Sequence, residues 1–288
     1  MKLSSKKLLA THRAILYGAP KTGKTELAGR LAEHFNLLWF DLENGFVTLT
    51  KLPAEWQERI ELISIPDTKT YPIAIETMLK VITGKALTIC EAHGKVDCPL
   101  CKKESAPVIA VELNAIPDDT IVVIDSLTQL ANSAMSFLTV KESDTYKPEW
   151  TDYRNQGSLM DKFLSQIQQA PYNVVCITHE TETEMDDGSK RLVPVAGTTN
   201  FSRNVSKYFD HVVRAAIANK KHGFFSSTTH SLTATAGSRT DVLLEKDIAP
   251  SLLRIFKPEL FPAEPPPASA NPTQGQTAVK LTLGMKGK

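Results

Sequence analysis

The chain contains 288 residues, of which 42% are hydrophobic and 23% are charged, and its formal net charge is +1 at pH 7. This length accommodates one large α/β domain with a tail, or two small domains. A near-neutral charge excludes a global attraction to nucleic acid, so a polyanion would have to bind to local patches. The basic first residues are followed by only a short apolar stretch, Leu8-Leu9-Ala10, and no apolar run approaches the length of a membrane span. We therefore expect a cytoplasmic protein without a membrane partner.

The first motif of the chain reads Gly18-Ala19-Pro20-Lys21-Thr22-Gly23-Lys24-Thr25, which matches the phosphate-binding pattern GxxxxGKT. It follows the apolar run 14–17, which predicts a strand, and it precedes 26–32, which predicts a helix. A strand, a glycine-containing loop and a helix N-terminus in this order direct backbone N–H groups at one anion. We expect this loop to bind ATP, with Lys24 at the β- and γ-phosphates and the Thr25 hydroxyl as a ligand of Mg²⁺.

The next apolar segments predict two strands and a helix. The run 37–40 reads as a buried strand that ends in Asp41-Leu42-Glu43, the run 60–65 as a third strand, and 71–82 as a helix with apolar side chains on one face. A carboxylate at the carboxyl end of a strand beside the phosphate-binding loop can polarise an attacking water molecule. Glu43 is therefore a candidate catalytic base. The alternative is a loop carboxylate or a helix-capping acid.

Three of the four cysteines lie close to a histidine, in the segments Cys90-Glu91-Ala92-His93 and Cys98-Pro99-Leu100-Cys101. In a reducing compartment such a cluster indicates a metal site rather than a pair of disulfides. Two ligands separated by two residues can bind one ion, and Cys90, His93, Cys98 and Cys101 together provide the Cys₃His set of a structural Zn²⁺ site. We expect a small zinc knuckle inserted at 88–108, and metal-free cysteines are the alternative.

A buried strand is predicted over 120–125, and its segment Ile121-Val122-Val123-Ile124-Asp125 is typical of a Walker B motif. Asp125 would hold Mg²⁺ through water at the carboxyl edge of the sheet. The next residue is Ser126, whereas many AAA+ ATPases have a glutamate base directly after this aspartate. If the chain hydrolyses ATP, the base must come from another strand, which again favours Glu43.

The rest of the chain continues the alternation of helices and strands. The patterns predict a crossover helix over 158–170, a strand over 173–178, a helix over 202–208 and a strand over 212–217. Strands that are apolar on both faces and alternate with helices predict an α/β fold with a mostly parallel sheet flanked by helices. The range 262–272 contains five prolines, so we expect 262–288 to be a disordered tail and 1–261 to be the ATPase domain.

Several motifs follow the phosphate-binding loop in the order of RecA-like recombinase cores: Phe40-Asp41-Leu42-Glu43, Pro66-Asp67-Thr68, Val122-Val123-Ile124-Asp125-Ser126-Leu127, Trp150-Thr151-Asp152-Tyr153 and Cys176-Ile177-Thr178-His179-Glu180. The chain resembles the phage RecA-like P-loop ATPases known as phage nucleotide-binding proteins, some of which are Sak-type single-strand annealing proteins. The resemblance covers roughly 11–262 and implies a RecA-like P-loop NTPase core with Glu43 as the catalytic base. It also puts His179 at the position of a polar γ-phosphate sensor, which is commonly glutamine in recombinases. A strand-end histidine without such a role is the alternative.

The resemblance further implies single-stranded DNA as a partner, held by the loops after the Walker B strand and after the sensor strand. The first loop, 139–157, carries aromatic residues among cations, which suit stacked bases beside a phosphate backbone: Lys147, Trp150, Tyr153 and Arg154. The second loop, 180–204, begins with acidic residues and then turns basic at Lys190, Arg191 and Arg203. The alternative is that both loops are solvated and mobile.

These features predict a DNA-stimulated ATPase of phage-type recombination, annealing or replication, located in the host cytoplasm if a phage encodes it. We expect the protein to form a homo-oligomer in which Arg239 is a candidate arginine finger, a side chain that contacts the γ-phosphate bound by the neighbouring subunit. A single-strand-binding protein and other replication proteins are further expected partners. The main alternative is an ATP-dependent helicase loader or adaptor that acts through protein contacts. A small-molecule kinase is disfavoured by the Asp125-Ser126 pair, by the order of the motifs and by the lack of an evident arginine-rich lid.

Overall fold

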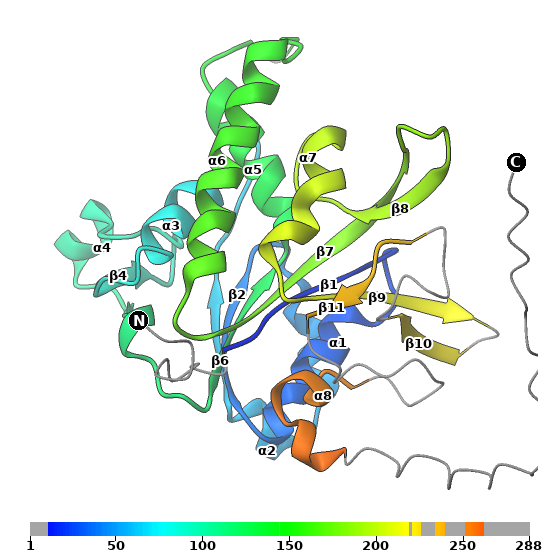
Figure 1. The fold of residues 1–288 in the computed structure, drawn as a ribbon. Coiled ribbons are helices and arrows are strands. Elements are labelled where there is room, and N and C mark those ends of the chain that lie inside the picture. The colour runs from blue at the N-terminus through cyan, green and yellow to red at the C-terminus, as the bar shows by residue number, and fades with distance from the viewer. Residues whose placement is uncertain (1–10, 144, 219–220, 226–233, 240–250, 262–288) are drawn as a thin grey trace, which may run out of the picture.

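The computed structural model describes residues 11–143, 145–218, 221–225, 234–239 and 251–261 (Figure 1). The predicted tail at 262–288 lies outside these ranges. Within the ranges, no helix combines the length and the apolarity that crossing a membrane requires.

Among the described residues, nine strands form the central sheet, and its main path runs β10-β9-β1-β7-β6-β2-β3. The strands of this path are β1 (Arg13–Gly18), β2 (Asn36–Asp41), β3 (Ile60–Ser64), β6 (Thr120–Asp125), β7 (Asn173–Glu184), β9 (His211–Ala218) and β10 (Lys221–Phe225). All neighbours on this path are parallel except β10, which is antiparallel to β9. Two more antiparallel strands, β8 (Lys190–Pro194) and β11 (Gly237–Ser238), pair with β7 and β9. The predicted mostly parallel sheet is confirmed.

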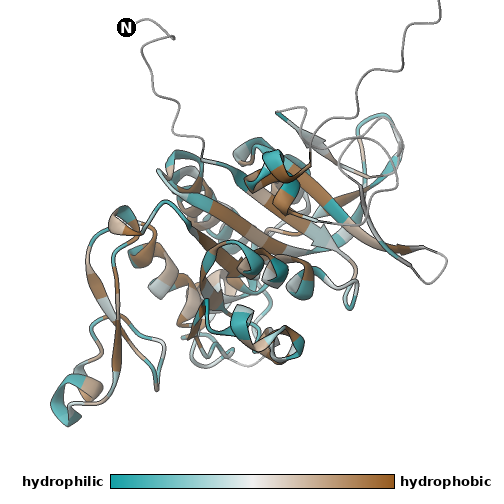
Figure 2. Ribbon diagram, turned by 90° about the horizontal axis from the view of Figure 1, so that it is seen from below, coloured by the Kyte–Doolittle hydropathy of each residue, from teal (hydrophilic) through white to brown (hydrophobic). Residues whose placement is uncertain are grey.

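Helices cover both faces of the sheet, because its strands carry apolar side chains on both sides. One face, with Phe40 and Ile124, packs against α3 (Ala74–Val81), α5 (Leu127–Thr139), α6 (Trp150–Gln169) and α7 (Thr199–Asn204). The other face, with Trp39 and Val123, packs against α1 (Lys24–Gly29), α8 (Leu253–Phe256) and the 3-10 turns Arg30–Glu33 and Gly45–Lys51. Shorter elements are α2 (Ala54–Gln57) and the 3-10 turns Leu113–Ala115, Val205–Tyr208 and Pro258–Leu260. Figure 2 shows the hydrophobic strands as a brown band between these layers.

The helix α6 begins at Trp150, well before its predicted start at 158. A capping box starts the helix there: the Glu149 side chain accepts from the N–H of Asp152, and the Asp152 side chain accepts from the N–H of Glu149. The prediction of a loop over 139–157 is therefore wrong in part, because only 140–149 connect α5 to α6.

The strand β7 continues past its predicted end at 178 to Glu184 and pairs with β8, so the predicted loop 180–204 is largely a β-hairpin followed by α7. The turn of this hairpin contains Asp187 and Gly188, and Gly188 has a φ of 77°. A glycine in the left-handed region allows the chain to reverse there at no steric cost.

The segment 87–111 forms a small second sheet of its own. In it β4 (Leu87–Cys90) pairs antiparallel with β5 (Val108–Val111), and α4 (Pro99–Glu104) lies between them in the chain. Figure 1 shows this segment beside α3, and in Figure 2 it projects from the body of the molecule as an arm. The arm contains the predicted zinc knuckle, and we keep the name knuckle for 87–111.

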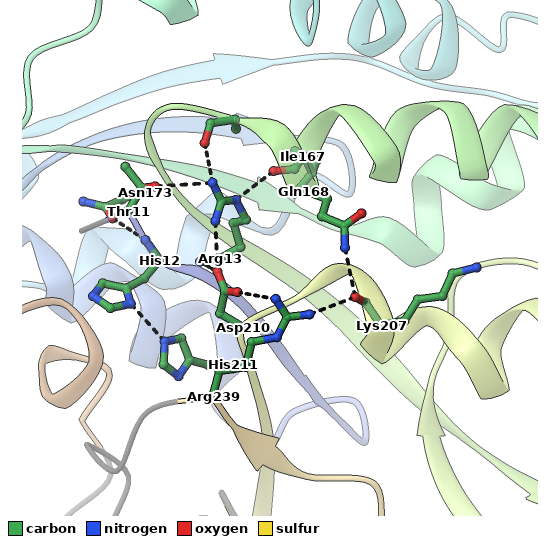
Figure 3. Close-up of polar contacts among 11 residues, drawn as sticks. Thr11, His12, Arg13, Ile167, Gln168, Asn173, Lys207, Asp210, His211 and Arg239 are labelled. Atoms are coloured by element: carbon green, nitrogen blue, oxygen red, sulfur yellow. Dashed lines mark hydrogen bonds and ion pairs between the residues drawn. The ribbon is translucent and has the colours of Figure 1, made fainter. Parts of the chain in front are cut away.

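A polar network at the amino edge of the sheet ties β1, β9 and β11 together (Figure 3). Asp210 pairs with Arg13 and with Arg239, and each nitrogen–oxygen distance is 3.1 Å. Arg13 also donates to the carbonyl oxygen of Ile167 at 3.2 Å, which attaches the end of α6 to the start of β1.

Two histidines meet beside this network. His12 Nδ1 lies 3.1 Å from His211 Nε2, and His211 Nδ1 lies 2.8 Å from the hydroxyl of Ser238. His211 is completely buried, and this burial, together with the nearby His12, lowers its pKa to about 4. The ring is therefore neutral at physiological pH.

Candidate active site

The phosphate-binding loop, Ala19-Pro20-Lys21-Thr22-Gly23, connects the end of β1 to the start of α1, as its pattern requires. Gly23 precedes the helix with a φ of 84°, a backbone conformation that disfavours a side chain. The Lys24 ammonium lies inside the loop and donates to the carbonyl oxygens of Gly18 at 3.0 Å and Ala19 at 2.8 Å. Burial lowers the pKa of Lys24, and the charge of Asp125 opposes this shift. The lysine therefore lies where the loop would enclose a phosphate chain.

Asp125 and His179 lie on the face of the sheet that α1 covers. Side chains alternate along a strand, so Asp125 shares the side of Val123, and His179 shares the side of Ile177. The Thr25 hydroxyl, on the first turn of α1, donates to Asp125 Oδ2 at 2.9 Å. The structure therefore brings together the two residues that the sequence analysis assigns to Mg²⁺.

The environment of Asp125 suits a cation. Its side chain is buried, and burial raises its pKa to about 7, against the effect of the bond from Thr25. A divalent cation favours the ionised carboxylate and so opposes this shift. A carboxylate and a hydroxyl oxygen are also the ligand types that Mg²⁺ prefers.

The loop after β2 is shaped by Asp41, whose importance the sequence analysis missed. The Asp41 carboxylate is buried and accepts bonds from the N–H groups of Glu43 at 3.1 Å, Gly45 at 3.0 Å and Phe46 at 3.3 Å. Three backbone donors on one carboxylate hold the loop in one conformation. An aspartate two residues before Glu43 was the signal for this arrangement, since aspartate side chains commonly bond to the backbone just after them.

The Glu43 side chain is 29% exposed and contacts both Ser126 and His179. The Ser126 hydroxyl donates to Glu43 Oε1, and His179 Nε2 lies 3.6 Å from Glu43 Oε2. Burial alone would raise the pKa of Glu43, but the contacts with His179 and Ser126 outweigh it and lower the pKa below its ordinary value. Glu43 is therefore ionised at neutral pH and able to accept a proton.

His179 connects this carboxylate to the β7–β8 hairpin. Its N–H donates to the Thr128 hydroxyl of α5 at 3.0 Å, and its carbonyl accepts from the N–H of Val195, just after β8, at 2.9 Å. Its Nδ1 is buried and has no hydrogen-bond partner among the described residues. The next residue, Glu180, pairs with Arg214 of β9 at 2.8 Å on the opposite face of the sheet, a contact that the sequence analysis did not anticipate.

The first group of predicted DNA contacts lies at the tip of the α5–α6 pair. Trp150 is 73% exposed and Tyr153 is 45% exposed, both on the first turns of α6 rather than on a loop. The Arg154 guanidinium lies 5.2 Å from the centre of the Trp150 ring, and Lys147 is exposed in the preceding connection. Aromatic and cationic groups therefore gather at this tip.

The second predicted group lies on the β7–β8 hairpin and α7, where acidic neighbours already engage some of the cations. Lys190 Nζ lies 3.0 Å from Glu182, and Arg203 pairs with Asp186 at 3.5 Å. Arg203 also donates to the carbonyl oxygen of Glu184, so it attaches α7 to the hairpin. Figure 1 shows the hairpin and the α5–α6 tip as separate protrusions of the molecule.

Two further groups of predicted residues lie away from the phosphate-binding loop. Arg239 is at the amino edge of the sheet, bound to Asp210, whereas the phosphate-binding loop of the same chain is at the carboxyl edge. In the knuckle, His93 Nδ1 lies 3.2 Å from the sulfur of Cys101, 3.8 Å from that of Cys98 and 3.9 Å from that of Cys90. The structure thus brings the four predicted zinc ligands together, and the three cysteines are buried.

Comparison with known proteins adds a family to this geometry. Residues 10–240 match a family described as an AAA domain. A comparison with curated proteins found no match. Among solved structures, a KaiC-like protein from the hyperthermophilic archaeon Pyrococcus horikoshii is 12% identical, with a TM-score of 0.36, over 74% of this chain and 76% of that chain. An ATPase from the type III secretion system of pathogenic bacteria is 14% identical, with a TM-score of 0.39, over 73% of this chain and 51% of that chain.

The family match covers most of the chain, and it includes the phosphate-binding loop, the Walker B strand and Glu43. The mostly parallel sheet and the contact between Thr25 and Asp125 agree with this match. The chain therefore belongs to the AAA domain family, and it is a P-loop ATPase with a mostly parallel sheet between two layers of helices.

Proposed function

We propose that this ATPase acts on single-stranded DNA in phage-type recombination, annealing or replication, with Glu43 as the base of ATP hydrolysis. The support for hydrolysis comes from the site itself, and the support for DNA comes from the α5–α6 tip. The order of motifs that resembles the phage RecA-like ATPases supports both parts of the proposal.

Nucleotide and Mg²⁺ follow from the family, and the residues present fit them. Lys24 and the backbone of the phosphate-binding loop would hold the phosphates, and Thr25 with Asp125 would hold Mg²⁺, which neutralises charge on the phosphate oxygens. Glu43 accepts the proton of the attacking water, while Ser126 and His179 keep its carboxylate oriented and ionised.

His179 offers a physical link between the nucleotide and the hairpin. Its side chain is beside Glu43, and its main chain is bonded to α5 and to the residue that follows β8. A change at the γ-phosphate that moves His179 would therefore also move the base of the hairpin. This arrangement supports the sensor role that the resemblance implies.

The observation that carries the DNA proposal is the exposure of Trp150. A tryptophan that is 73% exposed leaves a large apolar ring in water, and such a ring is commonly part of a binding surface. The ring lies next to Arg154, and Tyr153 and Lys147 are also exposed. Exposed aromatic rings among cations are the pattern that stacks bases and contacts the phosphate backbone of a single strand.

The test is to measure ATP turnover by the full-length protein with and without single-stranded DNA, together with an annealing assay on complementary strands. We expect DNA to raise the turnover and the protein to accelerate annealing. A turnover that DNA does not change, together with annealing that the protein does not accelerate, would contradict the proposal and favour the adaptor, which acts through protein contacts. The same samples, examined by light scattering with and without ATP, test the predicted homo-oligomer.

We also propose that the cluster Cys90, His93, Cys98 and Cys101 binds one structural Zn²⁺. In a tetrahedral site with Zn–S bonds of about 2.3 Å and a Zn–N bond of about 2.1 Å, the nitrogen and each sulfur lie about 3.6 Å apart. The three measured distances, 3.2, 3.8 and 3.9 Å, scatter around this value. Metal analysis of the folded protein should find about one zinc per chain, and finding none would contradict the proposal.

A further inference from the structure

The knuckle packs against the connection between β3 and α3. Gly94 follows the ligand His93, and a Cβ atom at Gly94 would lie only 2.8 Å from Ile65 Cα and 2.9 Å from Pro66 Cδ. The two backbones therefore approach as closely as only glycine permits. The Thr77 hydroxyl of α3 also donates to the Gly94 carbonyl at 2.8 Å in a buried position. The turn that contains the predicted zinc ligand His93 is therefore fixed against the β3–α3 connection and α3.

A first path leads from this contact to the backbone around Glu43. The N–H of Ile65 donates to the carbonyl oxygen of Asp41 at 2.9 Å. The Asp41 carboxylate in turn accepts the N–H groups of Glu43 and of the two residues Gly45 and Phe46. A residue covered by the knuckle is therefore one hydrogen bond away from the aspartate that shapes the Glu43 loop.

A second path leads to the side chain of the same glutamate. Asp67, which follows Pro66, accepts from Gln129 Nε2 of α5 at 3.0 Å. The N–H of Gln129 donates to the Ser126 hydroxyl oxygen at 3.2 Å, and this hydroxyl donates to Glu43. The two paths reach Glu43 from different sides, one through its backbone and one through its carboxylate.

The two-stranded sheet of the knuckle is joined to the main core by Ile89, Val96 and Val111. The cluster of cysteines is separate from that core. A structural zinc site would therefore constrain the turns that carry the ligands, which the core does not hold.

We infer that the zinc knuckle is a positioning element for ATP hydrolysis: the metal cluster holds Gly94 on the β3–α3 connection, and this connection keeps Glu43 oriented toward the attacking water. The inference rests on the proposed roles of Glu43 and of zinc. A misplaced catalytic group lowers kcat while the phosphate-binding loop, on another element, still binds ATP. Loosening the knuckle should therefore lower kcat and leave the ATP Kd unchanged.

The first test uses two matched variants of the full-length protein. Thr77→Val removes the hydroxyl that holds Gly94 and leaves all four cluster residues in place. Thr83→Val is the control, because Thr83 lies in the exposed turn just after the same helix, where its hydroxyl donates to the carbonyl oxygen of Lys80 at 2.7 Å. We expect Thr77→Val to keep its zinc and its ATP Kd and to lose about tenfold in kcat. A wild-type kcat in this variant, or a Kd weakened as much as kcat, would overturn the inference.

The second test removes and restores the metal in the wild-type protein. We expect a zinc chelator, followed by transfer to buffer with Mg²⁺, to lower kcat without changing the ATP Kd, and one equivalent of Zn²⁺ to restore kcat. A folded, zinc-free protein that retains the full kcat would contradict the inference. If removal of zinc unfolds the chain, the kcat of Thr77→Val is the measurement that tests the inference. Glu43→Gln is assayed in parallel so that the two proposals can fail separately. A wild-type kcat in Glu43→Gln would contradict the role of Glu43 as the base, whereas a wild-type kcat in Thr77→Val would contradict only the role of the knuckle.

Discussion

Glu43 Oε2 lies 3.6 Å from His179 Nε2, although β6 separates the strands that carry these two residues. The two side chains meet because Glu43 follows the carboxyl end of β2 and His179 lies on β7 just past its last pairing with β6, at Ile177. There the Ser126 hydroxyl bonds to the other oxygen of Glu43. The Glu43 carboxylate is thus held from both sides, and its lowered pKa keeps it ionised.

Glu43→Gln should keep ATP binding and lower kcat by about 10²–10⁴-fold, because the amide preserves size and accepts the Ser126 bond but takes no proton. Phosphate release and titration with a fluorescent ATP analogue measure the two effects. Glu61→Gln, at an exposed position of β3, is the control and should match the wild type. An unchanged kcat in Glu43→Gln would remove Glu43 from the base role.

Lys24→Ala should weaken ATP binding by about 10–100-fold, because a hydrogen bond to a charged group contributes about 1.5–3 kcal/mol. The ammonium is the charge that the loop encloses, since it bonds to the carbonyl oxygens of Gly18 and Ala19. Lys51→Ala removes an exposed lysine outside the loop and should bind ATP normally. Equal ATP Kd values for the two variants would show that Lys24 does not contact the phosphates.

The phosphate-binding loop, the Walker B strand and the mostly parallel sheet could be predicted because each depends on a contiguous pattern. Glu43 could be proposed because a strand-ending acid in a parallel sheet faces the carboxyl edge. Its bond to Ser126 could not be predicted, since it depends on β2 and β6 being neighbours, and periodicity does not reveal strand order. The same limit hid the pairing of Glu180 with Arg214.

The errors concern element boundaries, and the missed signals were local. Glu149 and Asp152 form a capping box that starts α6 at Trp150, but the aromatic and charged residues after it were interpreted as a loop. Asp187 and Gly188 form the turn of the β7–β8 hairpin, yet the acidic residues before them suggested a solvated loop. In both places the prediction followed the polar and charged composition of the segment and overlooked the short motifs that start a helix or form a turn.

The stability of the metal-free protein should depend on Asp125. Its pKa is about 7 in the folded protein, against about 3.9 for an unfolded aspartate, so the folded state binds the proton more tightly. The resulting stabilisation is present below about pH 4 and is lost as the pH rises to 7, with an upper limit of about 4 kcal/mol. Urea unfolding without Mg²⁺ should therefore show a steeper loss of stability between pH 5 and pH 8 in the wild type than in Asp125→Asn. Identical pH profiles would show that Asp125 is ionised throughout.

Acid should destabilise the folded protein through His211, because the pKa of His211 is lowered on folding whereas that of Asp125 is raised. Its folded pKa of about 4 lies below the value of about 6.5 for an unfolded histidine, so the stabilisation is present above pH 6.5 and is lost as the pH falls toward 4. The loss is at most about 3 kcal/mol. His211→Asn should flatten the fall of Tm between pH 6.5 and pH 4.5 relative to the wild type. His34→Asn, a control at a partly exposed site, should leave that slope unchanged.

Trp150 and Lys147 should contribute to DNA binding in different ways, which the dependence of the DNA affinity on salt concentration distinguishes. Stacking of a base on an aromatic ring contributes about 1–3 kcal/mol and is largely independent of salt, whereas a phosphate contact releases a counterion. Trp150→Ala should therefore weaken the Kd for single-stranded DNA by about 5–100-fold at every salt concentration. Lys147→Ala should reduce the slope of log K against log salt by about 0.7.

Fluorescence anisotropy of a labelled oligonucleotide at several salt concentrations measures both quantities. Leu260→Ala removes another exposed apolar side chain, which is 44% exposed on a different part of the molecule, and should bind DNA like the wild type. If Trp150→Ala binds as tightly as this control, the α5–α6 tip is not a base-stacking surface, and its exposed aromatic rings must serve contacts with protein instead. Because basal ATP turnover uses none of these side chains, all three variants should retain it, which separates a loss of DNA contact from a loss of folding.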